Sequence, residues 1–249
     1  MLSSKIALIT ATSGIGTATA VKFAEHGAAL ILTGRNTEVL MRHPVLKKNA
    51  TCIPADLMNE ADVEKLSAQI SNTHKKLDVL VNCAGVLERG TIENTSLEQY
   101  DRVMNMNVRT IYHLTMRLVP MLVKSKGNIV NVSSVNGIRA FPGVLAYNLS
   151  KAAVDQFTRC VALELAEKGV RVNSVNPGVT ITDLHKRGGL DDQAYAAFLE
   201  HSKSTHAMGR VGQADEIADV IAFLASEHAS FVTGASIPVD GGRHAMCPR

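Results

Sequence analysis

The chain has 249 residues, 46% of them hydrophobic, and a formal net charge of +3. A chain of this length and apolarity can bury a sizeable core, and α/β proteins of this size often form one domain. The charge is too small, and the basic residues are too dispersed, to indicate a protein that binds nucleic acid or a membrane surface.

Short apolar segments rich in valine and isoleucine recur along the chain. Most show no alternation of polar and apolar residues, which is typical of parallel strands buried on both faces. The predicted strands are Lys5–Thr10, Ala28–Thr33, Thr51–Ala55, Asp78–Asn82, Asn128–Ser133, Val170–Asn176 and Ile237–Val239.

Longer segments with helical spacing lie between these strands. In Glu60–Asn72, for example, Val63, Leu66 and Ile70 fall on one helix face. The predicted helices are Gly14–His26, Glu60–Asn72, Leu97–Val123, Tyr147–Glu167 and Ala214–Ala225. The alternation predicts a single Rossmann-type α/β domain over residues 1–249, a doubly wound parallel sheet of about seven strands with helices on both faces.

The segment Thr180–Arg210 interrupts this rhythm. It is polar, contains Gly188 and Gly189, and is too long for a simple connection between a strand and a helix. It also follows a strand end, where ligands bind in this fold class. We expect a substrate lid here, and the alternative is a surface excursion without function.

The four cysteines, Cys52, Cys83, Cys160 and Cys247, have spacings that fit neither a zinc site nor a disulfide framework. The nine histidines lack metal-binding spacing as well, so no metal is expected. The chain shows no signal-peptide pattern at its start and no apolar run near the ~20 residues of a membrane span. These features predict a cytoplasmic protein with reduced thiols.

A glycine-rich turn, Ala11–Gly16, follows the first predicted strand and precedes the first predicted helix. Glycines let a backbone approach a diphosphate closely, and the N–H groups at a helix N-terminus point at the anion. In this context the turn predicts a dinucleotide site.

The end of the second predicted strand bears on the choice of cofactor. A carboxylate there would bind both ribose hydroxyls of NAD, but Gly34 occupies the expected place and Arg35 follows it. A guanidinium can clamp a 2′-phosphate with two hydrogen bonds. We therefore expect NADP(H) to be preferred, with NAD(H) possible, and the alternative for Arg35 is a solvated loop arginine.

Tyr147 and Lys151 are four residues apart in a predicted helix and therefore share one face. A phenol with a pKa near ~10 is an adequate acid at neutral pH, and a nearby ammonium favours its phenolate. Tyr147 could then donate a proton to a forming alkoxide or accept one from an alcohol. The pair alone is a weak signal, because most such pairs lie on helix surfaces.

Taken together, these motifs resemble the short-chain dehydrogenase/reductase family in its short form. The resemblance runs to Val239-Asp240-Gly241-Gly242 and includes Asn82-Cys83-Ala84-Gly85 and Pro177-Gly178, each after a predicted strand. The family opens with TGxxxGxG, whereas this chain reads TATSGIG and lacks the first glycine. The resemblance to 3-oxoacyl-carrier-protein reductases is general.

The resemblance implies roles at a nicotinamide dinucleotide site. Asp56 would lie beside the adenine, Lys151 would bind the nicotinamide ribose, and the segment ending at Thr182 would face the nicotinamide carboxamide. The predicted cofactor residues are Thr12, Ser13, Gly14, Ile15, Gly16, Arg35, Asp56, Leu57, Asn82, Ala84, Gly85, Tyr147, Lys151, Pro177, Gly178, Val179 and Thr182.

The resemblance also implies a catalytic set, which is Asn107, Ser134, Tyr147 and Lys151. Ser134 would hold and polarise the substrate oxygen, and Asn107 would hold a water that links Lys151 to bulk solvent. The family's spacing selects these two residues over their neighbours Ser133 and Asn105.

The predicted function is an NADP(H)-dependent oxidoreductase acting on CH–OH donors, which interconverts a small-molecule carbonyl and a secondary alcohol. The alternative, supported by the shortened turn, is a catalytically weak protein that senses a nucleotide or binds a partner. We expect Val86–Gly90, Gly137–Leu145 with Arg139 and Phe141, and the lid to line the substrate site. Family members commonly form tetramers through their long helices, so we predict a homotetramer without nucleic-acid or membrane partners.

Overall fold

The computed structural model describes residues 1–10 and 13–247. In this part of the chain, seven parallel strands form one sheet in the order β3-β2-β1-β4-β5-β6-β7. The strands are β1 (Ile6–Thr10), β2 (Ala29–Gly34), β3 (Ala50–Pro54), β4 (Val79–Asn82), β5 (Asn128–Val132), β6 (Arg171–Pro177) and β7 (Ser236–Val239). The strand order reverses between β1 and β4, which places a crevice at the carboxyl ends of these two strands.

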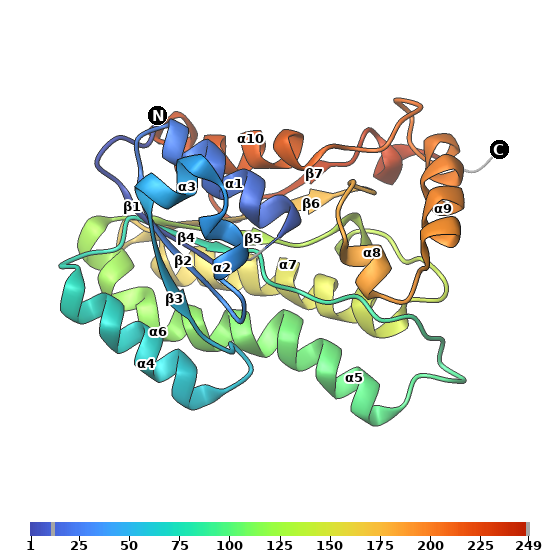
Figure 1. Ribbon diagram of the computed structural model, residues 1–249, viewed down its shortest axis with the longest axis horizontal. Coiled ribbons are helices and arrows are strands. Elements are labelled where there is room, and N and C mark those ends of the chain that lie inside the picture. Colours follow the sequence, from blue (N-terminus) through green and yellow to red (C-terminus); the bar gives the residue numbers. More distant parts are fainter. Residues whose placement is uncertain (11–12, 248–249) are drawn as a thin grey trace.

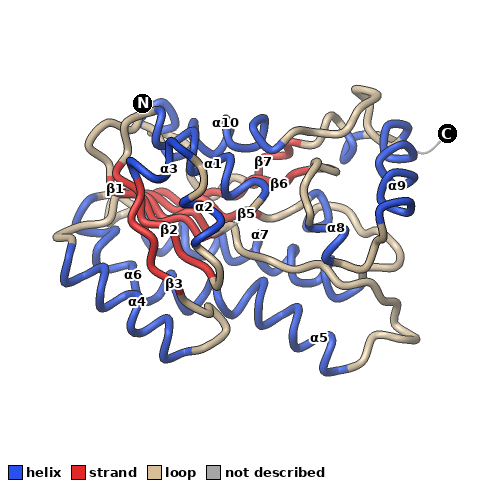
Figure 2. Tube along the Cα trace, in the orientation of Figure 1, coloured by secondary structure: helices blue, strands red, loops and turns tan. Residues whose placement is uncertain are grey.

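Helices cover both faces of the sheet (Figures 1 and 2), with α1, α3 and α10 over one face and α4, α6 and α7 over the other. The helices are α1 (Gly14–Glu25), α2 (Glu38–Met41), α3 (Pro44–Asn49), α4 (Glu60–Thr73), α5 (Leu97–Met104), α6 (Thr110–Ser125), α7 (Leu145–Ala166), α8 (Leu184–Arg187), α9 (Asp192–Ser204) and α10 (Ala214–Ala225). The predicted doubly wound α/β fold is confirmed.

The core lies in two layers, one on each side of the sheet. In β1, Ala7 and Ile9 pack in one layer with Phe23 of α1, while Leu8 packs in the other with Leu66 of α4. Successive side chains of a strand point to opposite faces, so both sets of side chains in β1 are buried. This double burial explains why the strands show apolar runs rather than alternation.

The predicted helix Leu97–Val123 is not continuous. It divides into α5 and α6, and a single π-helical turn, Asn105–Arg109, joins them. A π-turn widens the helix by one residue per turn and often occurs at functional sites. Here it contains Asn107, whose side chain is fully buried.

The segment predicted as a lid contains two helices, α8 and α9 (Figure 1). Asp191 caps α9 by accepting a hydrogen bond from the Ala194 backbone N–H at 2.8 Å. The Tyr195 hydroxyl donates to the Thr182 carbonyl at 3.0 Å, which ties α9 to the chain that follows β6. The role of this segment as a lid stays a prediction.

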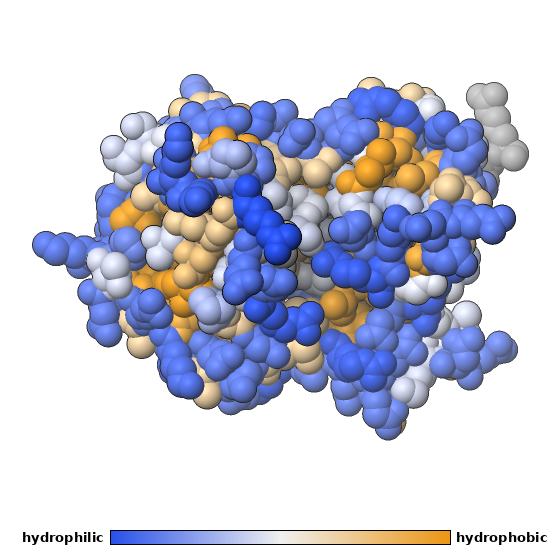
Figure 3. Space-filling model, viewed as in Figure 1, coloured by the Kyte–Doolittle hydropathy of each residue, from blue (hydrophilic) through white to orange (hydrophobic). Residues whose placement is uncertain are grey.

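The surface in Figure 3 is mostly hydrophilic, and its hydrophobic side chains gather in separate patches. Within the described residues, no helix combines the length and apolarity needed to span a membrane. The same residues hold no cluster of three or more His, Cys, Asp or Glu side chains suited to a metal ion.

Candidate active site

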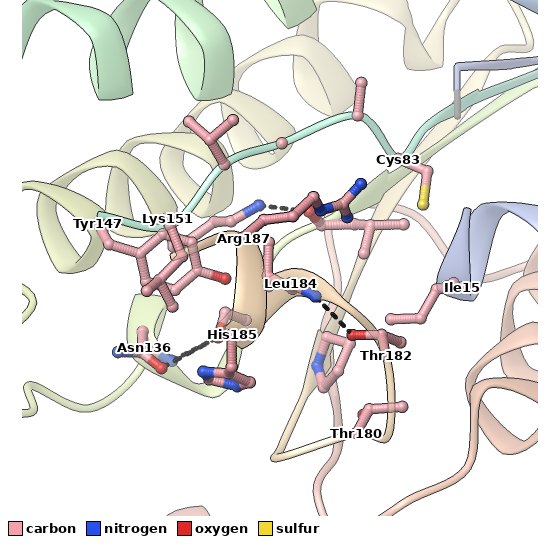
Figure 4. Close-up of a pocket in the computed structure, with 18 of the residues that line it drawn as sticks. Ile15, Cys83, Asn136, Tyr147, Lys151, Thr180, Thr182, Leu184, His185 and Arg187 are labelled. Carbon is pink, nitrogen blue, oxygen red and sulfur yellow. Dashed lines mark hydrogen bonds between the residues drawn. The ribbon is translucent and has the colours of Figure 1, made fainter. Parts of the chain in front are cut away.

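A cavity of about 590 Å³ opens at the carboxyl ends of the central strands. Its walls come from the glycine-rich turn, the ends of β2, β4, β5 and β6, and helices α7, α8 and α9. Ligands of open parallel sheets bind at this edge, where the strand order reverses. Figure 4 shows side chains from these separate segments converging on the cavity.

Most predicted cofactor residues line this cavity: Ser13, Gly14, Ile15, Arg35, Asp56, Leu57, Ala84, Gly85, Tyr147, Lys151, Pro177, Gly178, Val179 and Thr182. Thr12 lies outside the described residues. Gly16 and Asn82 are buried and do not line the cavity. Asn82 Nδ2 donates to Asn131 Oδ1 at 2.9 Å and to Thr115 Oγ1 at 3.3 Å, so it ties β4 to β5 and α6.

The glycine-rich turn is in close contact with the segment that follows β6. Gly14 has a φ of +56°, and a Cβ at this position would lie 3.0 Å from Thr182 Cγ2. A side chain there would therefore be strained as well as crowded. Ser13, the N-cap of α1, accepts a hydrogen bond from Arg187 Nη1 of α8 at 3.0 Å. The turn and α8 thus meet across the cavity.

The residues at this end of the cavity fit an anionic dinucleotide. Arg35 and Arg187 supply positive charge, and Gly14 leaves room for a close approach of backbone to ligand. The first turn of α1 has no acidic residue, so its free N–H groups favour an anion. Sequence reasoning missed Thr10, whose Oγ1 accepts hydrogen bonds from the backbone N–H groups of Cys83 at 3.0 Å and Ala84 at 3.1 Å.

Tyr147 and Lys151 lie in the first two turns of α7, and both side chains are buried. Lys151 Nζ is 5.6 Å from the centroid of the Tyr147 ring and donates to the Val132 carbonyl at 2.9 Å. Burial raises the pKa of Tyr147 to about 12, and the neighbouring Ser134 hydroxyl opposes this rise. Burial lowers the pKa of Lys151 to about 8. The helix thus holds a phenol and an ammonium together in the wall of the cavity, with little of either side chain exposed.

Ser134 follows β5 and is the N-cap of the 3₁₀ helix Val135–Gly137. Its hydroxyl accepts from the Asn136 backbone N–H at 3.2 Å and donates to Asn136 Oδ1 at 3.1 Å. Asn136 Nδ2 in turn donates to Asn148 Oδ1 of α7 at 2.6 Å. The adjacent Ser133 donates instead to the Lys151 carbonyl at 3.1 Å, so the two serines have different structural surroundings.

The π-turn brings Asn107 to the chain that follows β4. Asn107 Nδ2 donates to the Val86 carbonyl and to Ser150 Oγ, both at 2.9 Å, and its Oδ1 accepts from the Val86 N–H at 2.8 Å. A Cβ at Gly85 would lie 3.2 Å from Asn107 Oδ1 and 3.6 Å from Lys151 Nζ. Asn107 and Lys151 therefore both lie close to this glycine. Of the predicted catalytic set, Ser134, Tyr147 and Lys151 line the cavity, whereas Asn107 is buried behind it.

Comparison with known proteins agrees with this architecture. The family model described as enoyl-(acyl carrier protein) reductase matches residues 9–244. The 3-oxoacyl-[acyl-carrier-protein] reductase FabG of Thermotoga maritima is 37% identical, over 97% of this chain and 98% of that protein. The meso-2,3-butanediol dehydrogenase of Serratia marcescens is 34% identical, over 96% of this chain and 94% of that protein.

Among solved structures, a Caenorhabditis elegans short-chain dehydrogenase/reductase of unknown function, determined with cofactor, superposes with a TM-score of 0.91. It is 35% identical, and the match covers 99% of this chain and 97% of that one. The chain belongs to the short-chain dehydrogenase/reductase family. This is a family of oxidoreductases that act on alcohols and ketones with a nicotinamide dinucleotide.

A buried carboxylate lies behind the site in this dehydrogenase/reductase, and sequence reasoning missed it. Asp155, one helical turn after Lys151, is 2% exposed. It accepts from Ser174 Oγ at 3.1 Å and from Asn176 Nδ2 at 2.8 Å. Asn176 Nδ2 also donates to the Ser134 carbonyl at 2.8 Å. Burial raises the pKa of Asp155, and these hydrogen bonds oppose the rise.

The other end of the cavity has a different composition from the one expected. Phe141 lines it as predicted, but Arg139 does not; its Nε donates to the His244 carbonyl at 2.8 Å. Arg243, from the 3₁₀ helix Arg243–Ala245, lines the cavity in its place. No local motif marks this arginine, because only the tertiary fold brings the C-terminal segment over Phe141.

Proposed function

We propose that this chain is an NADP(H)-dependent dehydrogenase/reductase that interconverts a carbonyl and a secondary alcohol. The observation that carries the proposal is the buried pair of Tyr147 and Lys151, which lines the same cavity as Ser134 and the cofactor end. A protein that only sensed a nucleotide would have no need of a buried phenol beside a buried ammonium, since burying such a charge is costly. The pair therefore favours catalysis over the non-catalytic alternative.

A bound nicotinamide dinucleotide supplies hydride to the substrate carbon or accepts it. In the direction of reduction, the Tyr147 hydroxyl donates its proton to the developing alkoxide, and Ser134 Oγ–H donates a hydrogen bond to the same oxygen. The Lys151 ammonium stabilises the phenolate that Tyr147 leaves behind. Asn107 positions the chain around Gly85 and holds a water through which Lys151 and solvent exchange the proton.

The cofactor preference rests on the end of β2. Arg35 would clamp the 2′-phosphate of NADP(H), while Gly34 leaves no carboxylate to bind the unmodified ribose of NAD(H). Asp56 and Leu57 would flank the adenine. Arg187, already hydrogen-bonded to Ser13, would reach the diphosphate beside the shortened turn.

Calorimetric titration with NADPH and NADH tests this proposal. We expect the wild type to bind NADPH more tightly than NADH. Arg35→Ala should weaken NADPH binding about tenfold or more and change NADH binding much less, because the charge-assisted hydrogen bond forms only with the 2′-phosphate. Lys186→Ala, which removes an exposed cation paired with Asp192 at 2.6 Å, is the matched control. Equal affinities in the wild type would refute the NADP(H) preference.

We also propose a homotetramer built on α6 and α7. These helices expose large apolar side chains, with Tyr112 at 58%, Met116 at 50%, Leu149 at 48% and Leu163 at 79% exposure. A monomer that leaves such a surface in water is unusual, and apolar patches of this kind mark subunit contacts. Light scattering of the purified protein would contradict the proposal if it gave the mass of a monomer.

A further inference from the structure

Two arginines line the cavity away from the predicted cofactor end. Arg89 lies on the segment after β4, and Arg243 on the C-terminal 3₁₀ helix. Both line the same cavity as Tyr147 and Ser134, together with Phe141. The substrate region therefore combines apolar side chains with two guanidinium groups.

The positive charge of Arg243 has no acidic partner among the described residues. No carboxylate there lies within 4.0 Å of its guanidinium, and its buried Nε has no hydrogen-bond acceptor. The guanidinium carbon instead lies 4.4 Å from the centroid of the Phe141 ring. A partly buried, unpaired charge costs stability, so its presence in a ligand cavity calls for a functional reason.

The neighbouring carboxylates are already engaged. Asp240 accepts hydrogen bonds from the Gly242 N–H at 3.0 Å, the His244 N–H at 2.6 Å and His244 Nδ1 at 2.9 Å. Glu88, on the segment after β4, pairs with Arg102 at 2.9 Å. Burial lowers the pKa of Arg243, and the charge of Asp240 opposes this change only in part.

Arg89 and Arg243 act on the same part of the cavity. His185 of α8 lines it, and burial, followed by the charges of Arg89 and Arg243, lowers the pKa of this imidazole to about 4. His185 is therefore neutral at physiological pH. The two guanidinium groups therefore carry the positive charge here, while Glu88, which also lines the cavity, is paired with Arg102.

We propose that the substrate carries an anionic group, of carboxylate or similar oxyanion type, that binds Arg243 while its carbonyl faces Tyr147 and Ser134. This inference rests on the proposed function. Guanidinium presents its N–H donors in a planar fork that matches an oxyanion. The guanidinium of Arg243 packs against the ring of Phe141, and the hydrogen bond from Arg139 to the His244 carbonyl holds the turn that carries Arg243. Arg89, which is exposed, adds charge at the rim.

The test compares methyl ketones of increasing chain length, each ending in a carboxylate or in the matched neutral carboxamide, from 4-oxopentanoate and 4-oxopentanamide upward. Turnover with NADPH gives kcat/KM for each acid and its amide. Calorimetric binding of the same pairs, with and without NADP⁺, gives a readout that needs no turnover. The variants are Arg243→Met and, as a control that removes a lid cation outside the cavity wall, Lys186→Met.

We expect the acid to be preferred over the amide by about ten- to a hundredfold at the best chain length, as a charge-assisted hydrogen bond provides. Arg243→Met should reduce this ratio towards one, while Lys186→Met retains it. A titration of Arg243→Met with NADPH establishes that the variant folds and binds nucleotide.

Equal binding of acid and amide to the wild type would overturn the inference, and so would a preference that survives in Arg243→Met, because Arg243 would then have a purely structural role on Phe141. Failure of the proposed function looks different. In that case the acids still bind in preference to the amides and lose this preference in Arg243→Met, yet neither nucleotide binds and no ketone is reduced.

Discussion

Replacing Lys151 by methionine should make the nucleotide-free protein more stable at neutral pH while removing its activity. Lys151 is 4% exposed, and burial lowers its pKa from 10.5 to about 8, with Cys83 and Asp155 opposing the change. The folded protein therefore holds an ammonium that would be better solvated in the unfolded chain. Methionine has a similar length and carries no charge.

The magnitude follows from the two pKa values. At about 1.4 kcal/mol per pKa unit, the difference between 10.5 and about 8 corresponds to roughly 3 kcal/mol of unfolding free energy. Between these pH values the unfolded chain holds the proton of Lys151 and the folded protein does not, so the contribution of Lys151 to wild-type stability rises with pH across this window. Below this pH window both states hold the proton, and the folded protein bears the full cost of burying the ammonium. Above the window both states are neutral and this cost is absent.

Methionine does not titrate, so the stability difference between the variant and the wild type should shrink by roughly 3 kcal/mol from pH 7 to pH 10.5. The lost hydrogen bond from Lys151 to the Val132 carbonyl costs about 1 kcal/mol at every pH and cancels from this change. Burial raises the pKa values of Tyr147 and Cys83 to about 12 in the folded protein, from ordinary values of 10.0 and 9.0, so in this window they lose protons only in the unfolded chain. That loss lowers the stability of the wild type and the variant alike as the pH rises, and it cancels from the difference between them.

Urea unfolding followed by far-ultraviolet circular dichroism measures the effect, since the chain has no tryptophan. The assay needs the wild type and Lys151→Met at both pH values, without nucleotide. Lys186→Met is the control, because Lys186 is exposed. The stability difference between this variant and the wild type should not shrink from pH 7 to pH 10.5. A stability difference that is the same at pH 7 and pH 10.5 would refute the reasoning that burial of the charge dominates.

Three further predictions concern single residues. Tyr147→Phe should lower turnover about a hundredfold or more, because the proton donor is lost. Calorimetry should find its NADPH affinity within about twofold of the wild type, and unchanged turnover would contradict the role of Tyr147 as proton donor. Gly137→Ala should destabilise the protein by about 2 kcal/mol or more in the same urea assay, since its Cβ would lie 2.2 Å from Asp155 Oδ2 and 2.8 Å from the Lys151 carbonyl oxygen. A neutral effect would contradict the tight packing of this glycine against α7. Arg187→Ala should weaken NADPH and NADH binding by the same factor of about ten, as a diphosphate contact requires, whereas Lys186→Ala changes neither. A loss confined to NADPH would place Arg187 at the 2′-phosphate instead.

The order of elements was predictable because parallel strands buried on both faces leave a distinctive pattern. The fourth strand was expected at Asp78–Asn82 and is observed at Val79–Asn82. The fifth was expected at Asn128–Ser133 and is observed at Asn128–Val132. The differences are single residues at strand ends, where boundaries are least sharply defined. Asp78 and Ser133 lie just outside the observed strands, although their backbone N–H groups still donate to the carbonyls of Ile6 and Val175, each at 2.9 Å.

The features that the sequence did not reveal depend on long-range contacts. Nothing in Asn105–Arg109, which lacks glycine and proline, marks the extra residue of the π-turn. Asp155 resembles any polar residue of a long helix, because its partners Ser174 and Asn176 belong to β6. Arg243 lies in a polar C-terminal segment, and only its packing on Phe141 places it in the cavity. Each of these residues gains its environment from an element distant in sequence.

The distribution of charge in the cavity connects its two ends. Arg35 and Arg187 line the predicted cofactor end, while Arg89 and Arg243 line the substrate region. Lys151 lines the same cavity, and burial lowers its pKa to about 8 because the surroundings do not fully compensate its charge. An anionic substrate held at Arg243 would add negative charge to the cavity and so favour the ammonium of Lys151 over its neutral form. Binding of such a substrate would therefore raise the protonated fraction of Lys151, whose ammonium stabilises the phenolate of Tyr147.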